Sequence, residues 1–308
     1  MRIKFLLLIL LLYKQVIAED LSPDLVKNAH LASLNTLLIF TSQDGLSSGQ
    51  YNFTNIGVKM NILHLPFKVQ IESNTNLNLF FVGNIGYSRT FISDVNIKKS
   101  IDTRLDIDSH IRTYTAGLGA GIRYKIAKKF TFSGGMEVIY SRSGVSLKAT
   151  DDSIGDAIED FFRQNYNDNL SYKFFTEIEY RPIVVEYKPY AKLSYEVYET
   201  KSKFNYEELS KFTTASSVVK LSLGVESAPL YNFGVNYITL ETYFNASYLS
   251  GVVSDVTQLN KFATFGGIFY YNTPQKKFWS SRYYIEASTV QEKGLEGYNL
   301  GIGMSLAF

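Results

Sequence analysis

Hydrophobic and polar positions alternate with a period of two over most of this chain. In the C-terminal stretch GYNLGIGMSLAF, every second residue from Tyr298 to Phe308 is large and apolar, and the positions between them are small or polar. Successive side chains of a β-strand point to opposite faces, so this period predicts strands.

Twelve such segments follow one another, each long enough for a tilted strand to cross a membrane. They lie at about 33–42, 51–63, 77–92, 110–126, 130–148, 170–181, 183–200, 215–226, 231–249, 260–272, 278–290 and 295–308. The first alternates weakly and is also compatible with a helix. The segment at 231–249 changes parity near Tyr237 and Ile238, which suggests a β-bulge. Counts of ten or fourteen strands therefore stay open.

The connections between the segments alternate between two kinds. One set is mostly short and turn-like: 127–129, 181–182, 227–230 and 273–277, with a longer exception at 64–76. The other set is mostly longer and more polar: 43–50, 93–109, 149–169, 201–214, 250–259 and 291–294. Short turns on one side and long loops on the other are typical of outer-membrane barrels. An even number of strands puts both chain ends on the short-turn side.

Charged residues gather on one face of the predicted strands. Between residues 114 and 126, Tyr114, Leu118 and Ile122 share one face, whereas glycines, Arg123 and Lys125 share the other. If lipid covers the apolar face and water the other, the sheet must close, because each unpaired backbone group in hydrocarbon costs several kcal/mol. The pattern predicts an all-β fold, a transmembrane antiparallel up-and-down β-barrel of twelve strands. The 23 Tyr and 22 Phe suit aromatic belts, but a soluble β-sandwich is also rich in them.

The candidate site is the set of charged side chains expected to face the lumen. These are Arg123, Lys125, Glu137, Lys173, Glu177, Glu179, Glu186, Lys188 and Lys192. Charges in a narrow interior must be paired, so we expect a ladder of ion pairs that braces the barrel or sets its ion preference. Catalytic carboxylates are the alternative.

The N-terminus has the pattern of a signal peptide at residues 1–18: two basic residues, a short apolar run and a small-residue cleavage site. An uncleaved anchor is the alternative. Residues 19–32 are expected to be a periplasmic tail or a segment that enters the pore, and 33–308 the barrel domain. Within the loop at 149–169, helical spacing predicts a short acidic helix, which would be a lid, a constriction or a docking surface.

The charge balance and the scarcity of ligand residues limit the chemistry. The chain has 31 basic and 29 acidic residues, and without the signal peptide 28 remain against 29, a net charge of −1. This predicts no nucleic-acid partner. The chain has no cysteine, so no disulfide contributes to its stability. His30, His64 and His110 are widely separated, and neither a metal nor another cofactor is predicted.

The final strand and the glycine-, serine- and charge-lined interior resemble the β-barrel translocator of autotransporters. The chain is most similar to the solitary autotransporter-like barrels that lack a passenger, since about a dozen residues separate Ala18 from the first candidate strand. The resemblance implies that Tyr298, Leu300, Met304, Leu306 and Phe308 carry the signal read by the barrel-assembly machinery. It also implies passage to the cell outer membrane with periplasmic chaperones, and a lipid bilayer as the lasting partner.

Three function classes follow. We expect a monomeric, non-catalytic outer-membrane barrel of a Gram-negative bacterium, acting as a narrow or closed pore and a surface scaffold. A small-solute diffusion channel is the second class, because twelve strands fall between filled and open barrels. The third is an outer-membrane hydrolase: His110 with Ser109 resembles part of a phospholipase site, and with Asp106 and Asp108 part of an omptin-like protease site.

Overall fold

The computed structural model describes residues 46–71, 75–92, 107–149, 166–182, 184, 186–204, 212–277 and 280–306. In these ranges the elements are β1 (Leu46–Phe53), β2 (Val58–Ile71), β3 (Leu77–Ile92), β4 (Ile107–Ala127), β5 (Phe130–Ala149), β6 (Tyr166–Tyr180), β7 (Lys188–Phe204), β8 (Phe212–Glu226), β9 (Tyr231–Phe233), β10 (Asn236–Gly251), α4 (Val252–Thr257), β11 (Lys261–Lys277), β12 (Ser280–Glu292) and β13 (Leu295–Leu306). The signal peptide, residues 19–32, the segment at 33–42, the predicted loop helix and Phe308 lie outside them.

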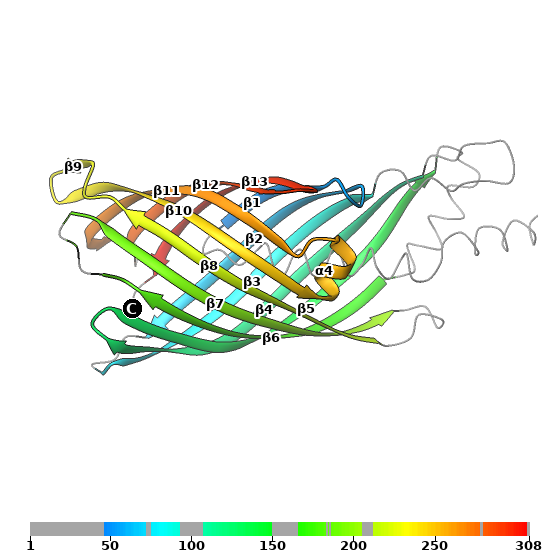
Figure 1. Cartoon of the computed structure of the whole chain (residues 1–308), viewed down its shortest axis with the longest axis horizontal. Helices are drawn as coiled ribbons and strands as arrows, with labels where there is room; N and C mark the ends of the chain where they lie inside the picture. The colour runs from blue at the N-terminus through cyan, green and yellow to red at the C-terminus, as the bar shows by residue number, and fades with distance from the viewer. Residues whose placement is uncertain are drawn as a thin grey trace, which may run out of the picture.

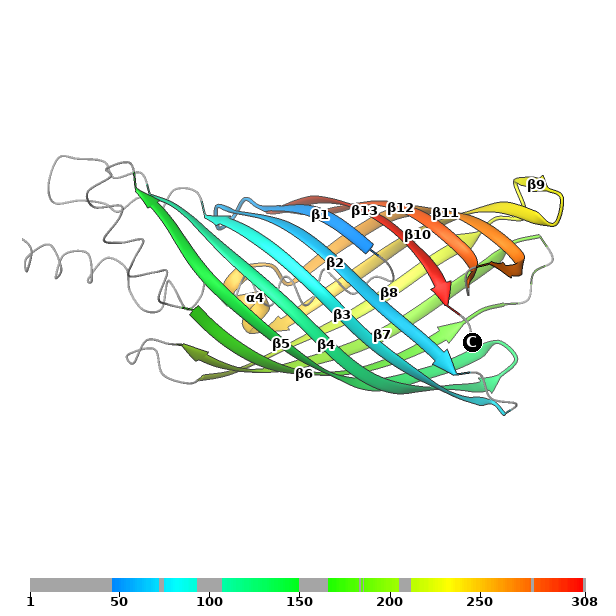
Figure 2. The same cartoon turned by 180° about the vertical axis from the view of Figure 1, so that it is seen from behind.

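The strands form one closed antiparallel sheet (Figures 1 and 2). Each strand of the wall pairs with its neighbours in sequence order, and β13 pairs with β1 over the whole length of β1, from Leu46↔Ile302 to Phe53↔Leu295. β9 pairs only with β10 and stands outside the wall, which leaves twelve strands around the barrel. The predicted all-β, twelve-stranded antiparallel barrel is confirmed. No helix in the described ranges has the length and hydropathy of a membrane span.

The first two strands differ from the prediction. The segment expected at 51–63 is two strands, because the chain turns at 54–57 and enters β2 at Val58. Gly57 supplies the positive φ of 63° that this turn requires. The apolar residues change parity across the turn, from Tyr51 and Phe53 to even-numbered positions such as Val58. The connection expected at 64–76 shrinks to 72–76, because β2 runs on to Ile71.

The parity change near Tyr237 is a hairpin and not a β-bulge. β9 ends at Phe233, the chain reverses through Gly234 with a φ of 66°, and β10 begins at Asn236. Two further boundaries move. β7 begins at Lys188, five residues later than expected, and β11 continues to Lys277 through an irregularity in its pairing with β12.

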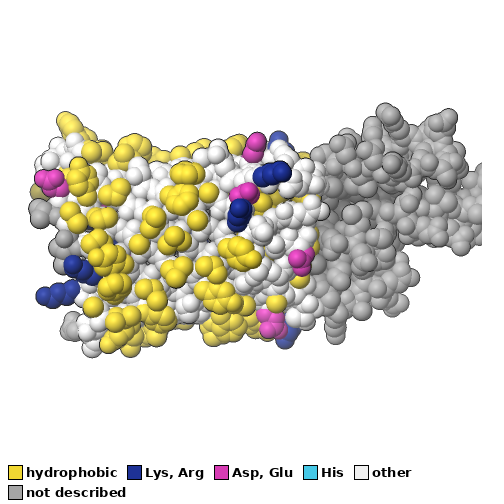
Figure 3. Space-filling view, in the orientation of Figure 1, with side chains coloured by type: hydrophobic (Ala, Val, Ile, Leu, Met, Phe, Trp, Pro, Cys, Tyr) yellow, Lys and Arg dark blue, Asp and Glu magenta, His cyan; other side chains and the backbone are white. Residues whose placement is uncertain are grey.

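The two faces of the wall separate apolar from small and polar side chains. Leu118 and Ile285 point outward with 68% and 64% of their surface exposed, whereas inward positions carry buried serine and threonine. On β4, Tyr114 and Tyr124 bracket the outward apolar run. Ten residues span about 34 Å along a strand, or about 26 Å after tilting, close to the apolar band of outer-membrane barrels. The side chains of Lys, Arg, Asp and Glu seen in Figure 3 gather toward the two ends of the described barrel.

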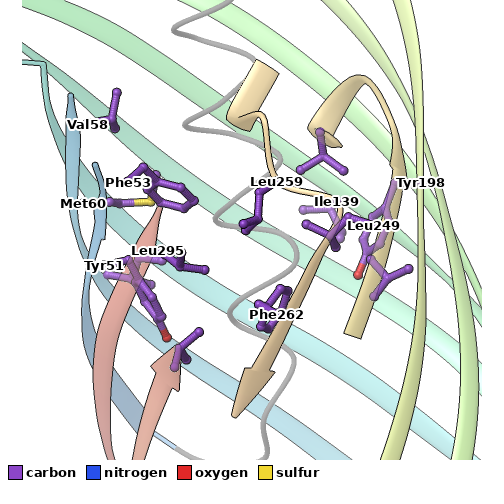
Figure 4. Packing of buried hydrophobic residues seen from close by; sticks show 14 residues of the cluster. Tyr51, Phe53, Val58, Met60, Ile139, Tyr198, Leu249, Leu259, Phe262 and Leu295 are labelled. Carbon is purple, nitrogen blue, oxygen red and sulfur yellow. The ribbon is translucent and has the colours of Figure 1, made fainter. Parts of the chain in front are cut away.

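Apolar side chains also fill part of the interior, near the end of the barrel where the longer connections lie. The buried cluster consists of Tyr51, Phe53, Val58, Met60, Ile62, Ile139, Tyr198, Val218, Leu249, Val253, Leu259, Phe262, Val290 and Leu295. In the view of Figure 4, Leu259 and Phe262 lie between the residues of β1 and β2 and those of β5 and β7. Here the apolar face is the inner one, the reverse of the middle of the barrel.

Inner-face glycines allow close backbone and side-chain approach, and one of them gives a stability prediction. A Cβ at Gly119 would lie 2.2 Å from the backbone oxygen of Met136, which no side-chain rotation can relieve. We expect Gly119→Ala to lower the free energy of unfolding by about 2 kcal/mol through overpacking. Urea unfolding of the refolded barrel in detergent, followed by tryptophan and tyrosine fluorescence, measures this change.

Gly267→Ala is the matched control. A Cβ at Gly267 would meet only the backbone oxygen of Glu241, at an ordinary 3.6 Å. We expect it to leave the unfolding midpoint within error of the parent chain. Backbone entropy alone would raise the stability of both variants, because alanine restricts the unfolded chain more than glycine does. Equal loss in both variants would therefore contradict the assignment of the Gly119 penalty to its close contact with Met136.

Candidate functional site: the barrel lumen

The lumen carries an ion-pair network at the short-turn end of β4, β6 and β7. Glu179 on β6 is only 4% exposed and accepts a hydrogen bond from Arg123 on β4 at 2.9 Å. Arg181 also donates to the same carboxylate, and Lys192 stands directly across from Glu179 on β7. One buried acid therefore faces three cations. Such a group contributes to stability only when it is fully paired, as here.

Glu226 is the centre of a second network at the same end. This carboxylate, also 4% exposed, forms an ion pair with Arg282 on β12 at 2.7 Å. It also accepts hydrogen bonds from Lys188 on β7 at 3.3 Å and from the Thr239 hydroxyl at 2.9 Å. Arg282 stacks in turn on the ring of Tyr270, with its guanidinium carbon 3.4 Å from the ring centroid. Since β8 and β12 are separated by β10 and β11, Glu226 ties non-adjacent parts of the wall together.

Tyrosines reach from one strand to a carboxylate two strands away by lying over an intervening glycine. Tyr190 on β7 crosses Gly224 on β8 and donates to Glu241 on β10 at 2.7 Å. Tyr243 on β10 crosses Gly266 on β11 and donates to Glu286 on β12. A tyrosine ring over glycine saves interior space and fixes three strands at once. These side chains occupy lumen volume that a wide channel would leave to water.

The middle of the lumen repeats the arrangement with other residues. Lys173 on β6 pairs with Glu196 on β7 at 3.1 Å, and the Tyr198 hydroxyl donates to the same carboxylate. Glu137 on β5 is 6% exposed and accepts a hydrogen bond from the Asn84 amide of β3. This contact passes over Gly117 on β4, the strand between them.

The helix α4 folds against the inner face of the wall near the apolar cluster. The backbone N–H of Val253 donates to the hydroxyl of Ser216 on β8 at 3.2 Å, and Ser216 is a buried inward position. Val253 and Thr257 are buried, and Leu259, just after the helix, is 4% exposed. Residues 252–259 therefore narrow the lumen at the end opposite to the charged networks.

The nine predicted lumen charges are not all equivalent. Arg123, Glu137, Lys173, Glu179, Lys188 and Lys192 lie in the networks just described. Glu177 is half-buried on the inner parity of β6. Lys125 is exposed near the end of β4, and Glu186 is exposed in the connection before β7, so Glu186 lies outside the wall. That correction follows from the later start of β7.

Sequence reasoning missed several members of the site: Tyr190, Glu196, Glu226, Glu241, Tyr243, Arg282 and Glu286. The alternation in the sequence indicates that these side chains point inward. Their partners lie on non-adjacent strands and are set by the strand register, not by spacing along the chain. Of the residues implied in the assembly signal, Tyr298, Leu300 and Met304 point outward and are more than half exposed. The side chain of Leu306, like Phe308, lies outside the described ones.

His110, the residue on which the hydrolase alternatives depend, shares the outward face of β4 with Tyr114. Its ring packs edge-on against the ring of Phe91, with centroids 5.3 Å apart. Asp106 lies outside the described residues, as do the side chains of Asp108 and Ser109. Within the described residues, no group of three or more His, Cys, Asp or Glu is placed to hold a metal ion.

Comparisons with known proteins support the fold. The translocator domain of the autotransporter NalP from Neisseria meningitidis matches with a TM-score of 0.57 and 11% identity, over 89% of this chain and 93% of that one. The fold is that of an autotransporter-type barrel. The β domain of the Bordetella autotransporter BrkA (TM-score 0.53, 8% identity, 85% and 97% covered) agrees. So does the transport unit of AIDA-I from Escherichia coli (TM-score 0.51, 8% identity, 91% and 97% covered).

Sequence comparisons add nothing to this. No family model matches the chain, and no curated protein matches it. The expected resemblance to autotransporter barrels is confirmed at the level of the fold.

Proposed function

We propose that the protein is a non-catalytic outer-membrane barrel that acts as a narrow or closed pore and presents a scaffold at the cell surface. The observation that carries this proposal is the set of side chains that bridge and narrow the lumen. Ion pairs and tyrosines bridge the wall at the short-turn end, and α4 with the apolar cluster lies at the other end. Packing of this kind would leave water and ions no wide polar path.

Location in the outer membrane is supported by the outward apolar band, the tyrosines at its edges and the closed sheet. By this proposal the long connections face the outside, the short turns face the periplasm, and no cofactor is required. The barrel is a monomer that reaches the membrane with the help of periplasmic chaperones and the barrel-assembly machinery. Cell fractionation with surface labelling of the loops tests both location and orientation.

Conductance in planar bilayers tests the pore. We expect the intact chain to show small or no steady conductance. Replacing residues 252–259 by a short Gly-Ser turn removes α4 and Leu259 from the lumen and should raise conductance severalfold. Replacing the β9 hairpin, residues 231–235, by a similar turn is the control, because β9 stands outside the wall. A large steady conductance of the intact chain would instead establish a diffusion channel.

The non-catalytic part of the proposal has its own test. The refolded chain should release no fatty acid from phosphatidylethanolamine vesicles and cleave no dibasic peptide above the buffer rate. Turnover that is abolished by His110→Ala, with the barrel still folded, would contradict the proposal and establish a hydrolase.

A further inference from the structure

Three adjacent strands carry the same outward-facing order of residues toward the end with the long connections. On β3 the aliphatic run is followed by Tyr87 and then Arg89, and β5 repeats the order with Tyr140 and Arg142. On β4, which runs the other way, Tyr114 and Arg112 occupy the same positions. In each strand the arginine is the next outward position after the tyrosine.

The register brings these arginines together. Arg89 stands directly opposite Arg112, and Tyr87 opposite Tyr114, whose rings are in contact with centroids 5.1 Å apart. Arg142 stands opposite Tyr114 and is thus a diagonal neighbour of Arg112. Directly opposed side chains have their Cβ atoms about 5 Å apart, and diagonal ones about 7–8 Å. We call Arg89, Arg112 and Arg142 the arginine triad.

Like charges placed opposite each other destabilise a sheet unless an anion lies between them. Arg142 has one, since its guanidinium binds Asp168 at 2.7 Å and stacks on the Tyr166 ring. Among the described side chains, Arg89 and Arg112 form no ion pair with a carboxylate. Arg89 stacks on Phe91, and its Nε atom is buried without a hydrogen-bond acceptor in the described structure.

Further cations surround the arginine triad. Lys59 on β2 points outward one diagonal step from Arg89. On the other flank, Lys203 stands opposite Asp168 and faces outward on β7. Asp168 is the one acid among these six outward groups of β2 to β7, so the six groups together carry a net positive charge.

We propose that the arginine triad binds the phosphate groups of a glycolipid of the outer leaflet, of the lipid A type. The inference rests on the proposed location and orientation in the outer membrane. The tyrosine row marks where the hydrocarbon ends, so the guanidinium groups one position further lie at the depth of lipid headgroups. Arginine matches phosphate with two parallel hydrogen bonds, and two adjacent arginines can hold one phosphate from both sides.

The chemistry favours a lipid over free phosphate. On the outer face, the tyrosine row lies directly below the triad, and aliphatic residues follow it. Ile85, Leu118 and Val138 are all exposed there. A ligand with acyl chains would cover this surface while its phosphates contact the arginines. Inorganic phosphate would gain only the charge contacts.

Lipid binding to the folded full-length chain tests the proposal. The barrel is refolded in a zwitterionic detergent, and bis-phosphorylated lipid A and the same lipid without phosphates are titrated in, with native mass spectrometry as readout. We expect the phosphorylated lipid to bind and Arg89→Gln/Arg112→Gln to weaken it by at least about tenfold. Arg89→Lys/Arg112→Lys keeps the charge but loses the paired hydrogen bonds, and should bind with an intermediate affinity.

Lys128→Gln/Lys129→Gln is the matched control. It removes the same charge from an exposed turn at the opposite end and should leave binding unchanged. Equal binding by the parent and the Gln variant, both with the heat-modifiable mobility of a folded barrel, would overturn the proposal. The proposal would also be overturned if the parent chain bound the lipid without phosphates, or phosphatidylglycerol, as tightly as phosphorylated lipid A. Displacement of bound lipid A by millimolar inorganic phosphate would overturn it too. Fractionation tests the location independently, so the two failures are distinguishable.

Discussion

Replacing Glu226 by Gln is expected to lower the free energy of unfolding by about 3 kcal/mol, the lower end of the range for breaking a buried ion pair. The substitution keeps the shape of the side chain but removes the charge that Arg282 and Lys188 share. Arg282 is 28% exposed in the narrow lumen, whereas Lys188 is 59% exposed and retains solvation. Urea titration of the refolded barrel in detergent, followed by fluorescence, measures the loss.

Glu199→Gln supplies the comparison. Glu199 pairs with Lys201 at 4.0 Å on the outer face, and both side chains are more than half exposed. An exposed pair of this kind contributes about 0–1 kcal/mol, so the control should unfold close to the parent. If both variants lose the same small amount, the lumen is more hydrated than its packing indicates and the closed-pore proposal weakens with it.

Placing a charge at Leu118 should lower the stability of the folded barrel by about as much as Glu226→Gln does. Leu118 lies midway between Tyr114 and Tyr124 on β4 and is 68% exposed on the outer face. An arginine facing the middle of the hydrocarbon costs about 2–4 kcal/mol, because the guanidinium must be desolvated or must thin the bilayer around it. Leu118→Arg should therefore shift folding into phosphatidylcholine vesicles to lower urea concentrations.

Ile126→Arg is the control that separates the effect of depth in the bilayer from the effect of introducing an arginine. Ile126 is 58% exposed on the same face of the same strand, but it lies beyond Tyr124 at the short-turn end. Near the interface the cost falls to about 0–1 kcal/mol. Equal costs at the two positions would show that the outer face of β4 does not cross a bilayer between its tyrosines, and the membrane assignment would have to be abandoned.

The middle of the barrel was predictable from the sequence because its physics is local. Where lipid lies on one side and a narrow lumen on the other, large apolar side chains and small or charged ones must alternate. β4 shows this pattern between Tyr114 and Tyr124, and β6 shows it with Phe175 as an inward exception. Their faces follow from parity alone, and so do the inward directions of Arg123 and Glu179.

The loop end of β1 and β2 was misread because the polarity of the wall reverses there. Tyr51, Phe53 and Met60 point inward and are buried, while Asn52 and Lys59 point outward and are exposed. Above the hydrocarbon, water covers the outside, so these strands pack apolar residues inward as a soluble sheet does. The parity change of the apolar residues across 54–57 was the signal for the turn, but it is visible only if apolar residues are allowed to face inward at this end.

The partners of the lumen charges were not predictable at all. Glu226 could be placed on the inner face from the alternation in LSLGVE, but its contact with Arg282 depends on four strands, their register and the curvature of the wall. The glycines that let Tyr190 and Tyr243 cross a strand are recognisable only once that register is known. Spacing along the chain carries no information about contacts of this type.

The hairpin of β4 and β5 is much longer than its counterparts across the barrel. It continues beyond Arg112 and Arg142 to the pair Ile107↔Ala149, whereas β1 has only eight residues. The rim of the described barrel is therefore uneven and extends further at β4 and β5 than at β1. A glycolipid bound at the base of this hairpin would place its first sugars along the hairpin. Carbohydrate on the cell surface would then shield that flank from antibodies, while the β1–β13 seam would stay accessible to them.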